Sequence, residues 1–174
     1  MQAPFLLASF FSVLLIASAI FDLTSFRIPN ILPGAMLLLF PAFLIAMAYS
    51  THSVSWGDIS LHLLAGILGL IIGMFLFARG WVGGGDAKLF AVICLWLGWE
   101  SMLEYVVLAS LTGGALTFAL LALRRTPLPS FLVKLPWLVR LADPKSAVPY
   151  GLALVAAALF IFPGTELFRL ASSG

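Results

Sequence analysis

Charged residues are scarce in this sequence. They make up 9% of 174 residues, with nine Lys and Arg against seven Asp and Glu, whereas apolar residues make up 63%. A soluble protein needs more polar residues than this to cover its surface, so the composition predicts an integral membrane protein. No stretch between the apolar runs is long enough for a separate soluble unit. We therefore expect residues 1–174 to form a single membrane domain with no nucleic-acid partner.

Cysteine is also nearly absent, because Cys94 is the only one in the chain. A single cysteine excludes an intramolecular disulfide framework and the paired-cysteine metal sites. The two histidines, His52 and His62, have no cysteine or acid cluster at ligand spacing around them. We expect neither a metal nor another cofactor, and Cys94 is interpreted as a packing residue.

Apolar runs of about bilayer length fill most of the chain. They are Phe5–Phe21, Ile31–Tyr49, Leu61–Ala78, Leu89–Trp99, Leu103–Leu123 and Val148–Leu170. The predicted fold is all-α and polytopic, with about six transmembrane helices. The run that ends at Trp99 is short, so its inner end should lie below the membrane surface. We expect Gly83–Gly85 to be a non-helical loop at that depth, beside a water-filled pocket on the cytoplasmic side.

Basic residues gather in the first, third and fifth connections between these runs. Examples are Arg27 in the first connection, Lys88 in the third and Arg124 in the fifth. The positive-inside rule places these connections in the cytoplasm and the N-terminus outside. The stretch Thr126–Lys145 combines three prolines with interleaved apolar and basic residues. It resembles an amphipathic segment that lies in the membrane interface. Its favoured role is anchoring to anionic lipid, with substrate contact as the alternative.

Two acidic residues stand out at the predicted cytoplasmic side. Asp22 closes the first apolar run, where we expect the first helix to end, and Asp86 follows three glycines. An ionisable group in the hydrocarbon layer costs about 2.5 to 3.5 kcal/mol, so it is usually kept for function or firmly paired. Two adjacent carboxylates share a proton, so that one can act as a base and the other as an acid. Such a pair can activate water for attack on a peptide carbonyl.

Each acid taken alone has a simpler interpretation. Asp22 is consistent with a helix cap or an ion pair with Arg27, and the glycine-rich stretch with a flexible loop that carries a solvated acid. Their combination at similar depth favours acid–base chemistry. A rival class is a component of a proton-coupled transporter, in which membrane acids relay protons. A third possibility is a catalytically inactive scaffold for pilus assembly.

Three stretches resemble the hallmark motifs of the type IV prepilin peptidases: Phe21–Asn30, Gly83–Leu89 and Val148–Ala153. The second contains the Gly-x-Gly-Asp signature that is shared with presenilin-type intramembrane aspartyl proteases. The resemblance implies an endopeptidase of the bacterial or archaeal inner membrane. It would cut the basic leader from prepilins or pseudopilins at the cytoplasmic face, next to a hydrophobic segment that stays in the membrane. Asp22 and Asp86 match the catalytic aspartates of this family.

The resemblance also suggests roles for other residues. Gly83 and Gly85 would shape the loop and Lys88 would support it. Pro149, Tyr150 and Gly151 match the third stretch, with a structural role at least as well supported as substrate contact.

Long members of the family carry a cytoplasmic domain with Cys-x-x-Cys motifs and also N-methylate the trimmed pilin. This chain has one cysteine and a tight turn at that place. It resembles the short, peptidase-only class of tight-adherence (Flp) pilus systems, for which N-methylation is not expected. The sequence leaves open the oligomeric state, the particular prepilin, and whether the two aspartates lie close together in the resting protein.

Overall fold

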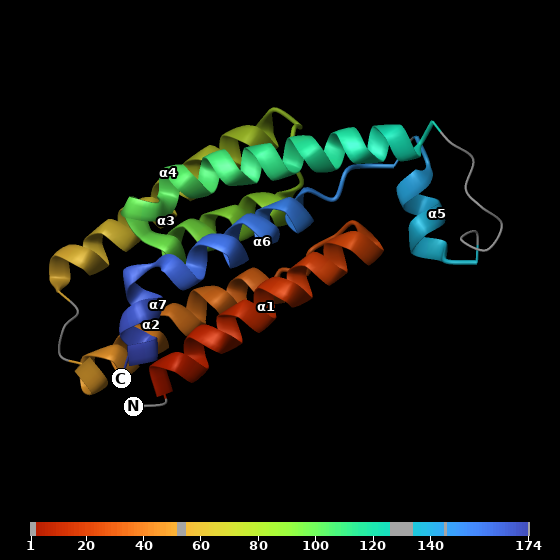
Figure 1. Cartoon of the computed structure of the whole chain (residues 1–174). Coiled ribbons are helices and arrows are strands. Elements are labelled where there is room, and N and C mark those ends of the chain that lie inside the picture. Colours follow the sequence, from red (N-terminus) through yellow and green to blue (C-terminus); the bar gives the residue numbers. More distant parts are fainter. Residues whose placement is uncertain (1–2, 52–54, 126–133, 145, 174) are drawn as a thin grey trace.

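The computed structural model describes residues 3–51, 55–125, 134–144 and 146–173, and within these ranges the chain is helical and contains no strand. The elements are α1 (Ala3–Ser25), α2 (Ile31–Thr51), α3 (Trp56–Ala78), α4 (Gly84–Leu123), α5 (Pro136–Ala142), α6 (Tyr150–Ile161), a 3-10 turn η1 (Phe162–Gly164) and α7 (Glu166–Ser173). The prediction of an all-α membrane protein is confirmed. Both chain ends lie at the same end of the molecule, and α5 lies at the opposite end (Figure 1).

The ends of α3 show how short polar signals delimit an apolar helix. At its start, the Ser55 hydroxyl accepts the Asp58 N–H, and the Asp58 carboxylate accepts the Ser55 N–H, each at 3.1 Å. This reciprocal capping box satisfies two N–H groups that the first turn leaves without helical partners. At its end, Gly80 adopts a left-handed φ of 71°, and the Trp81 N–H bonds back to the Leu76 carbonyl at 3.0 Å. A glycine at this position closes the helix because it has no side chain to oppose the left-handed turn.

Helix α4 is a hairpin of two arms. In a straight helix Phe90 and Tyr105 would be about 22 Å apart, yet their rings stack with centroids 5.6 Å apart. The chain reverses at Gly98, whose φ of 77° and ψ of 179° are accessible to glycine alone among the common residues. Figure 1 shows the two arms running beside each other. The His62 ring donates from Nδ1 to the Leu95 carbonyl at 2.8 Å, which ties α3 to the last turn of the first arm.

Four helices in the described ranges are long and apolar enough to cross a membrane, namely α1, α2, α3 and α4. The number becomes five if α6 and η1 are joined with α7, from which they are bent by 58°, as one span. The six expected segments correspond to α1, α2, α3, the two arms of α4, and α6 to α7. The first arm of α4 is about 21 Å long, which is shorter than the hydrocarbon layer. The number of crossings and the orientation therefore stay predictions.

The first arm of α4 forms the centre of the fold, because every residue from Leu89 to Gly98 is buried. Trp96 stacks on Phe11 of α1 with ring centroids 4.1 Å apart, and its Nε1 donates to the Met36 carbonyl of α2 at 3.0 Å. On the α3 side, three glycines face the arm: Gly66, Gly69 and Gly73. Small residues allow two membrane helices to approach closely. The arm that begins with Asp86 is therefore held from several sides.

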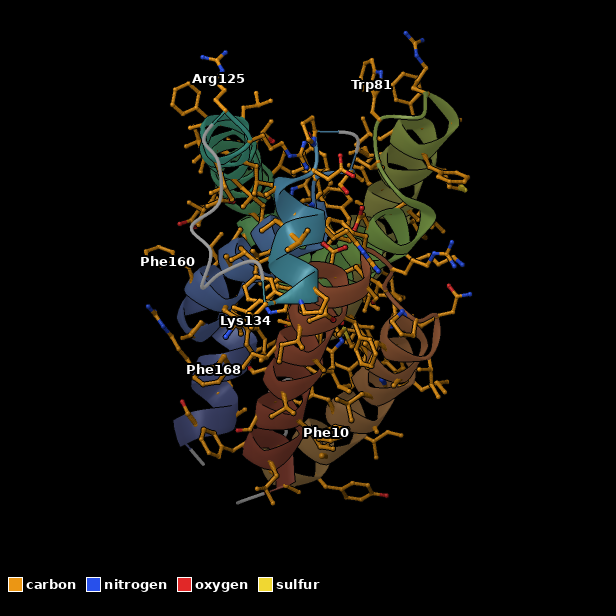
Figure 2. The ribbon with its side chains drawn as sticks, turned by 90° about the vertical axis from the view of Figure 1, so that its right-hand side faces the viewer. Phe10, Trp81, Arg125, Lys134, Phe160 and Phe168 are labelled. Atoms are coloured by element: carbon orange, nitrogen blue, oxygen red, sulfur yellow. The ribbon has the colours of Figure 1, made fainter. Side chains whose placement is uncertain are left out.

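Apolar side chains also cover the outside of the molecule. Phe10 of α1 is 51% exposed and Phe160 of α6 is 76% exposed, and Phe160 points outward in Figure 2. Exposed apolar side chains of this size are expected where a helix faces lipid rather than water. The described surface thus agrees with a bilayer environment.

Candidate active site

Asp22 lies in the last turn of α1 and is 4% exposed. The prediction that the first helix ends at this residue is wrong, because α1 continues to Ser25. The hydroxyls of Thr24 and Ser25 bond to carbonyls of the preceding turn, at 2.7 Å and 2.6 Å, so these polar residues stay within the helix. Across the interface, Oδ2 of Asp22 accepts the Leu152 N–H at 3.3 Å. Asp22 thus caps a helix end, but the helix is α6.

The turn after α1 places Ile28 inside the site. Phe26 has a φ of 54°, which makes it the one non-glycine residue in the described ranges with a positive φ. This conformation costs about 1 to 2 kcal/mol and directs the chain sharply away from α1. Ile28 is then buried between the beginnings of α4 and α6: a Cβ on Gly85 would lie 3.1 Å from its Cβ, and one on Gly151 would lie 2.8 Å from its Cδ1. The sequence contained a signal for Ile28 that was missed, namely an apolar residue inside a polar turn.

Asp86 lies in the first turn of α4 and is half-buried. The expected non-helical loop over Gly83–Gly85 is wrong, because α4 begins at Gly84 and only Gly83 precedes it. The carboxylate of Asp86 folds back and accepts the Gly83 N–H through Oδ2 at 3.2 Å. An acid in the first turn of a helix is stabilised by the free N–H groups and by the helix dipole, and this explains why the helix starts so early.

The two acids come together at Gly151. The carboxylate of Asp86 lies close enough to that of Asp22 to act on it electrostatically, and the backbone of Gly151 lies within interaction range of both. Gly151 is buried, and a Cβ there would lie 2.8 Å from Oδ2 of Asp22. A residue with a side chain would therefore push the carboxylate away. The end of α1 and the beginnings of α4 and α6 meet at this point, at the end of the molecule away from the chain termini (Figure 1).

The other residues suggested by the sequence surround this centre. Lys88 is exposed and donates from Nζ to Oδ1 of Asn30 at 2.8 Å, so it joins α4 to the turn before α2. Pro149 is fully buried and precedes the first turn of α6. Tyr150 is half-buried, and its hydroxyl lies 3.5 Å from that of Thr117 on the second arm of α4. Gly83 is exposed, whereas Gly85 packs against the buried turn.

Arg124 has a specific role that the sequence did not reveal. Its guanidinium donates to the carbonyls of Leu141, Ser146 and Ala147 at 3.0 to 3.1 Å. These contacts fix the link that leads from α5 to the start of α6. Composition identifies Arg124 only as one more basic residue, because its three acceptors are backbone atoms. In the predicted amphipathic segment, residues 126–133 and 145 lie outside the described residues, and the described part contains the short helix α5.

A cavity of about 630 Å³ adjoins Asp86. It lies between α3, the two arms of α4 and α6, and the described side chains that line it are mostly apolar, not those of the expected water-filled pocket. Among them only Asp86 carries a charge. The lining consists of Ile72, Gly73, Leu76, Val82, Asp86, Ala87, Phe90, Val106, Ala109, Ser110, Gly113, Gly114, Thr117, Phe118, Leu121, Tyr150 and Leu154.

The sequence of residues 9–118 matches the model of the type IV leader peptidase family. This match spans more than half of the chain and includes both aspartates. The chain belongs to the type IV leader peptidase family. No curated protein and no solved structure matches it. Membership indicates a membrane-embedded peptidase with a prepilin-type substrate.

Proposed function

We propose that this chain, residues 1–174 acting as one domain, is an aspartic endopeptidase with Asp22 and Asp86 as its catalytic pair. It hydrolyses the bond between the basic leader and the hydrophobic segment of a prepilin or pseudopilin. The observation that carries the proposal is the meeting of the two carboxylates at Gly151, where three helix ends converge. The family supports peptidase chemistry on a prepilin-type substrate.

In the proposed reaction the pair carries one shared proton. The ionised carboxylate takes a proton from water while the water oxygen attacks the carbonyl carbon, and the protonated carboxylate donates to the carbonyl oxygen. The tetrahedral gem-diol then collapses. The carboxyl that took the water proton gives it to the leaving nitrogen as the C–N bond breaks, and the other carboxylate takes a proton from a gem-diol hydroxyl, which restores the shared proton. Asp86 lines the cavity and Asp22 is held by the Leu152 N–H, so Asp86 is the acid nearer to a substrate in that space.

The distribution of charge supports a cytoplasmic active site in the inner membrane. Arg27 follows the end of α1 that carries Asp22, and Lys88 lies two residues after Asp86 in α4. Arg124 follows the second arm of α4. Lys134 and Arg140 flank or occupy α5, at the same end of the molecule (Figure 2). The positive-inside rule assigns this end to the cytoplasm, where a basic leader would be found. In this proposal the chain is a peptidase of the short class that serves Flp pili, and it does not methylate its product.

Single substitutions in a cell that co-expresses a prepilin test the proposal. Asp22→Asn and Asp86→Asn preserve a side-chain oxygen for the Leu152 and Gly83 N–H groups, so we expect normal membrane levels and loss of leader cleavage. Asp58→Asn is the matched control, because Asp58 lies in the first turn of α3 and outside the lining of the cavity. The readout is the gel mobility and mass of the prepilin. Cleavage that survives either active-site substitution contradicts the proposal and makes proton flux in liposomes the next assay.

A further inference from the structure

The cavity beside Asp86 is a groove with two distinct walls. One wall is α3, through Ile72 and Leu76, and the other is the second arm of α4. Along that arm the lining extends from Val106 to Leu121, which corresponds to about 22 Å of helix. The beginning of the first arm, with Asp86, lies between the walls. Figure 2 looks toward this end of the molecule, where Trp81 after α3 and Arg125 after α4 lie well apart.

The wall formed by α4 is accessible from the bilayer. Ser110, Gly114 and Phe118 line the groove, are exposed, and follow one another at intervals of four residues. Side chains at this spacing share one face of a helix. Phe118 is 77% exposed. A membrane-embedded molecule can therefore reach Asp86 sideways, without first leaving the lipid.

The lining also limits what the groove can accept. Its surface is mostly apolar. Several lining residues are small and leave room for a partner to approach closely, among them Gly73, Ala109, Gly113 and Gly114. In lipid, helices associate through close packing against such small residues, because apolar burial gives them no additional driving force. Among the described lining residues only Asp86 can pair with a charged ligand, and the other polar side chains are the hydroxyls of Ser110, Thr117 and Tyr150. An apolar helix about 15 residues long matches both the length and the chemistry of the groove.

We propose that this groove binds an apolar helical segment of the substrate adjacent to the cleaved bond, with one face of that segment packed against Gly114. The inference rests on the proposed peptidase function and adds where the membrane part of the substrate lies. The observation that supports it is that Asp86 itself lines the groove. A second groove, of about 490 Å³ between α2 and α3, adjoins neither acid and serves as the comparison.

Two glycines form a matched pair for the test. Gly114 lines the substrate groove and Gly34 of α2 lines the second groove, and a Cβ at either position would meet no atom within 4 Å. A leucine at either position therefore meets no obstacle at its Cβ and can extend its side chain into the groove. Because the larger side chain occupies the space of the substrate, Gly114→Leu should slow cleavage of a membrane-embedded prepilin about tenfold or more. Gly34→Leu should cleave at about the wild-type rate.

The outcomes separate the two proposals. Wild-type cleavage by Gly114→Leu, or equal losses in both leucine variants, overturns the groove while leaving the peptidase function intact. Absence of cleavage by the unmodified chain in the same assay counts against the peptidase function itself. Gly114→Ala adds one methyl group to the face against which the segment packs, so its loss of cleavage should be smaller than that of Gly114→Leu. A loss larger than that of Gly114→Leu contradicts the proposal.

Cross-linking gives a direct readout. The only cysteine, Cys94, is 0% exposed, so a cysteine introduced at Gly114 or Gly34 reacts selectively. In an Asp86→Asn background, which keeps the prepilin uncleaved, Gly114→Cys should form disulfides with cysteines placed every three or four residues along the apolar segment of the prepilin. Gly34→Cys should form few. Cross-links that favour Gly34, or that show no preference, overturn the proposal.

Discussion

Replacing Gly151 by alanine adds one methyl group at the point where the two acids meet. The new Cβ would lie 2.8 Å from Oδ2 of Asp22 and 2.8 Å from Cδ1 of Ile28. Ordinary contacts of a Cβ begin at 3.4 Å, so either the neighbours or α6 must move by about 0.6 Å. The Asp22 carboxylate is buried and held by the Leu152 N–H, so a shift in α6 also displaces the carboxylate.

The expected magnitudes follow from this geometry. Overpacking of a filled site costs about 1 to 3 kcal/mol, whereas alanine in place of a helical glycine returns about 0.5 to 1 kcal/mol. We expect a net loss of about 1 to 2 kcal/mol in stability. Misplacement of a catalytic group by 1 Å can cost about 100-fold in rate, so a shift of this size should slow cleavage about tenfold or more.

The assay compares leader cleavage and thermal unfolding in detergent for Gly151→Ala and for the double variant with Ile28→Val. The valine removes Cδ1 and hence one of the two clashes, so part of the stability should return. The contact with Asp22 persists, and cleavage should stay slow. Gly34→Ala in α2 controls for helix propensity, because its Cβ would meet no atom within 4 Å and Gly34 lies outside the lining of the cavity beside Asp86. The reasoning is refuted if Gly151→Ala cleaves as fast as the wild type, or if Ile28→Val restores the rate.

Three further predictions concern the supports of the site. Arg124→Gln should lower stability by about 1 to 3 kcal/mol and slow cleavage, because the link to α6 loses its donors. Thermal unfolding and prepilin cleavage measure this, and Arg124→Lys should restore only part of either quantity because it lacks the fork of donors. Gly73→Ala would place a Cβ 2.8 Å from the Ala87 carbonyl and should lower the unfolding temperature and slow cleavage, since the arm with Asp86 must shift; an unchanged rate contradicts this. His62→Ala removes the hydrogen bond to the Leu95 carbonyl, and Gly98→Ala would place a Cβ 2.6 Å from the His62 ring. Because the alanine at position 62 also removes that clash, the stability losses of the two variants, measured by thermal unfolding, should be less than additive in the double variant.

The helices and their order could be predicted well from the sequence, because apolar runs of bilayer length are separated by short polar turns. The sequence also predicted a break close to Gly98, because the fourth expected segment ends at Trp99 and the fifth begins at Leu103. Helix ends were less predictable. Apolar composition gave no reason for α1 to continue past Asp22, and three consecutive glycines concealed a helix that starts at Gly84, where an acid in its first turn compensates for their low propensity.

The candidate site could be predicted as a set of residues but not as an arrangement. The motifs selected both aspartates and the stretch at Gly151, and charge placed them at one side of the membrane. Ile28 and Arg124 escaped notice because their roles depend on neighbours distant in sequence: Ile28 fills the space between two helix starts, and Arg124 binds backbone carbonyls. Every residue has a backbone carbonyl, so a side chain that binds carbonyls does not require particular residue types at the positions it contacts. The cavity is likewise a product of packing, since its lining comes from three helices.

The bond between Asp22 and the Leu152 N–H spans 130 residues of chain. Asp22 leaves the ribosome within the first helix, whereas the amide that holds it belongs to α6, after every other long helix has been made. A growing chain therefore carries both acids in the membrane for most of its synthesis without the backbone that brings them together. On the proposed mechanism, the protein becomes a peptidase only when α6 has been made and inserted.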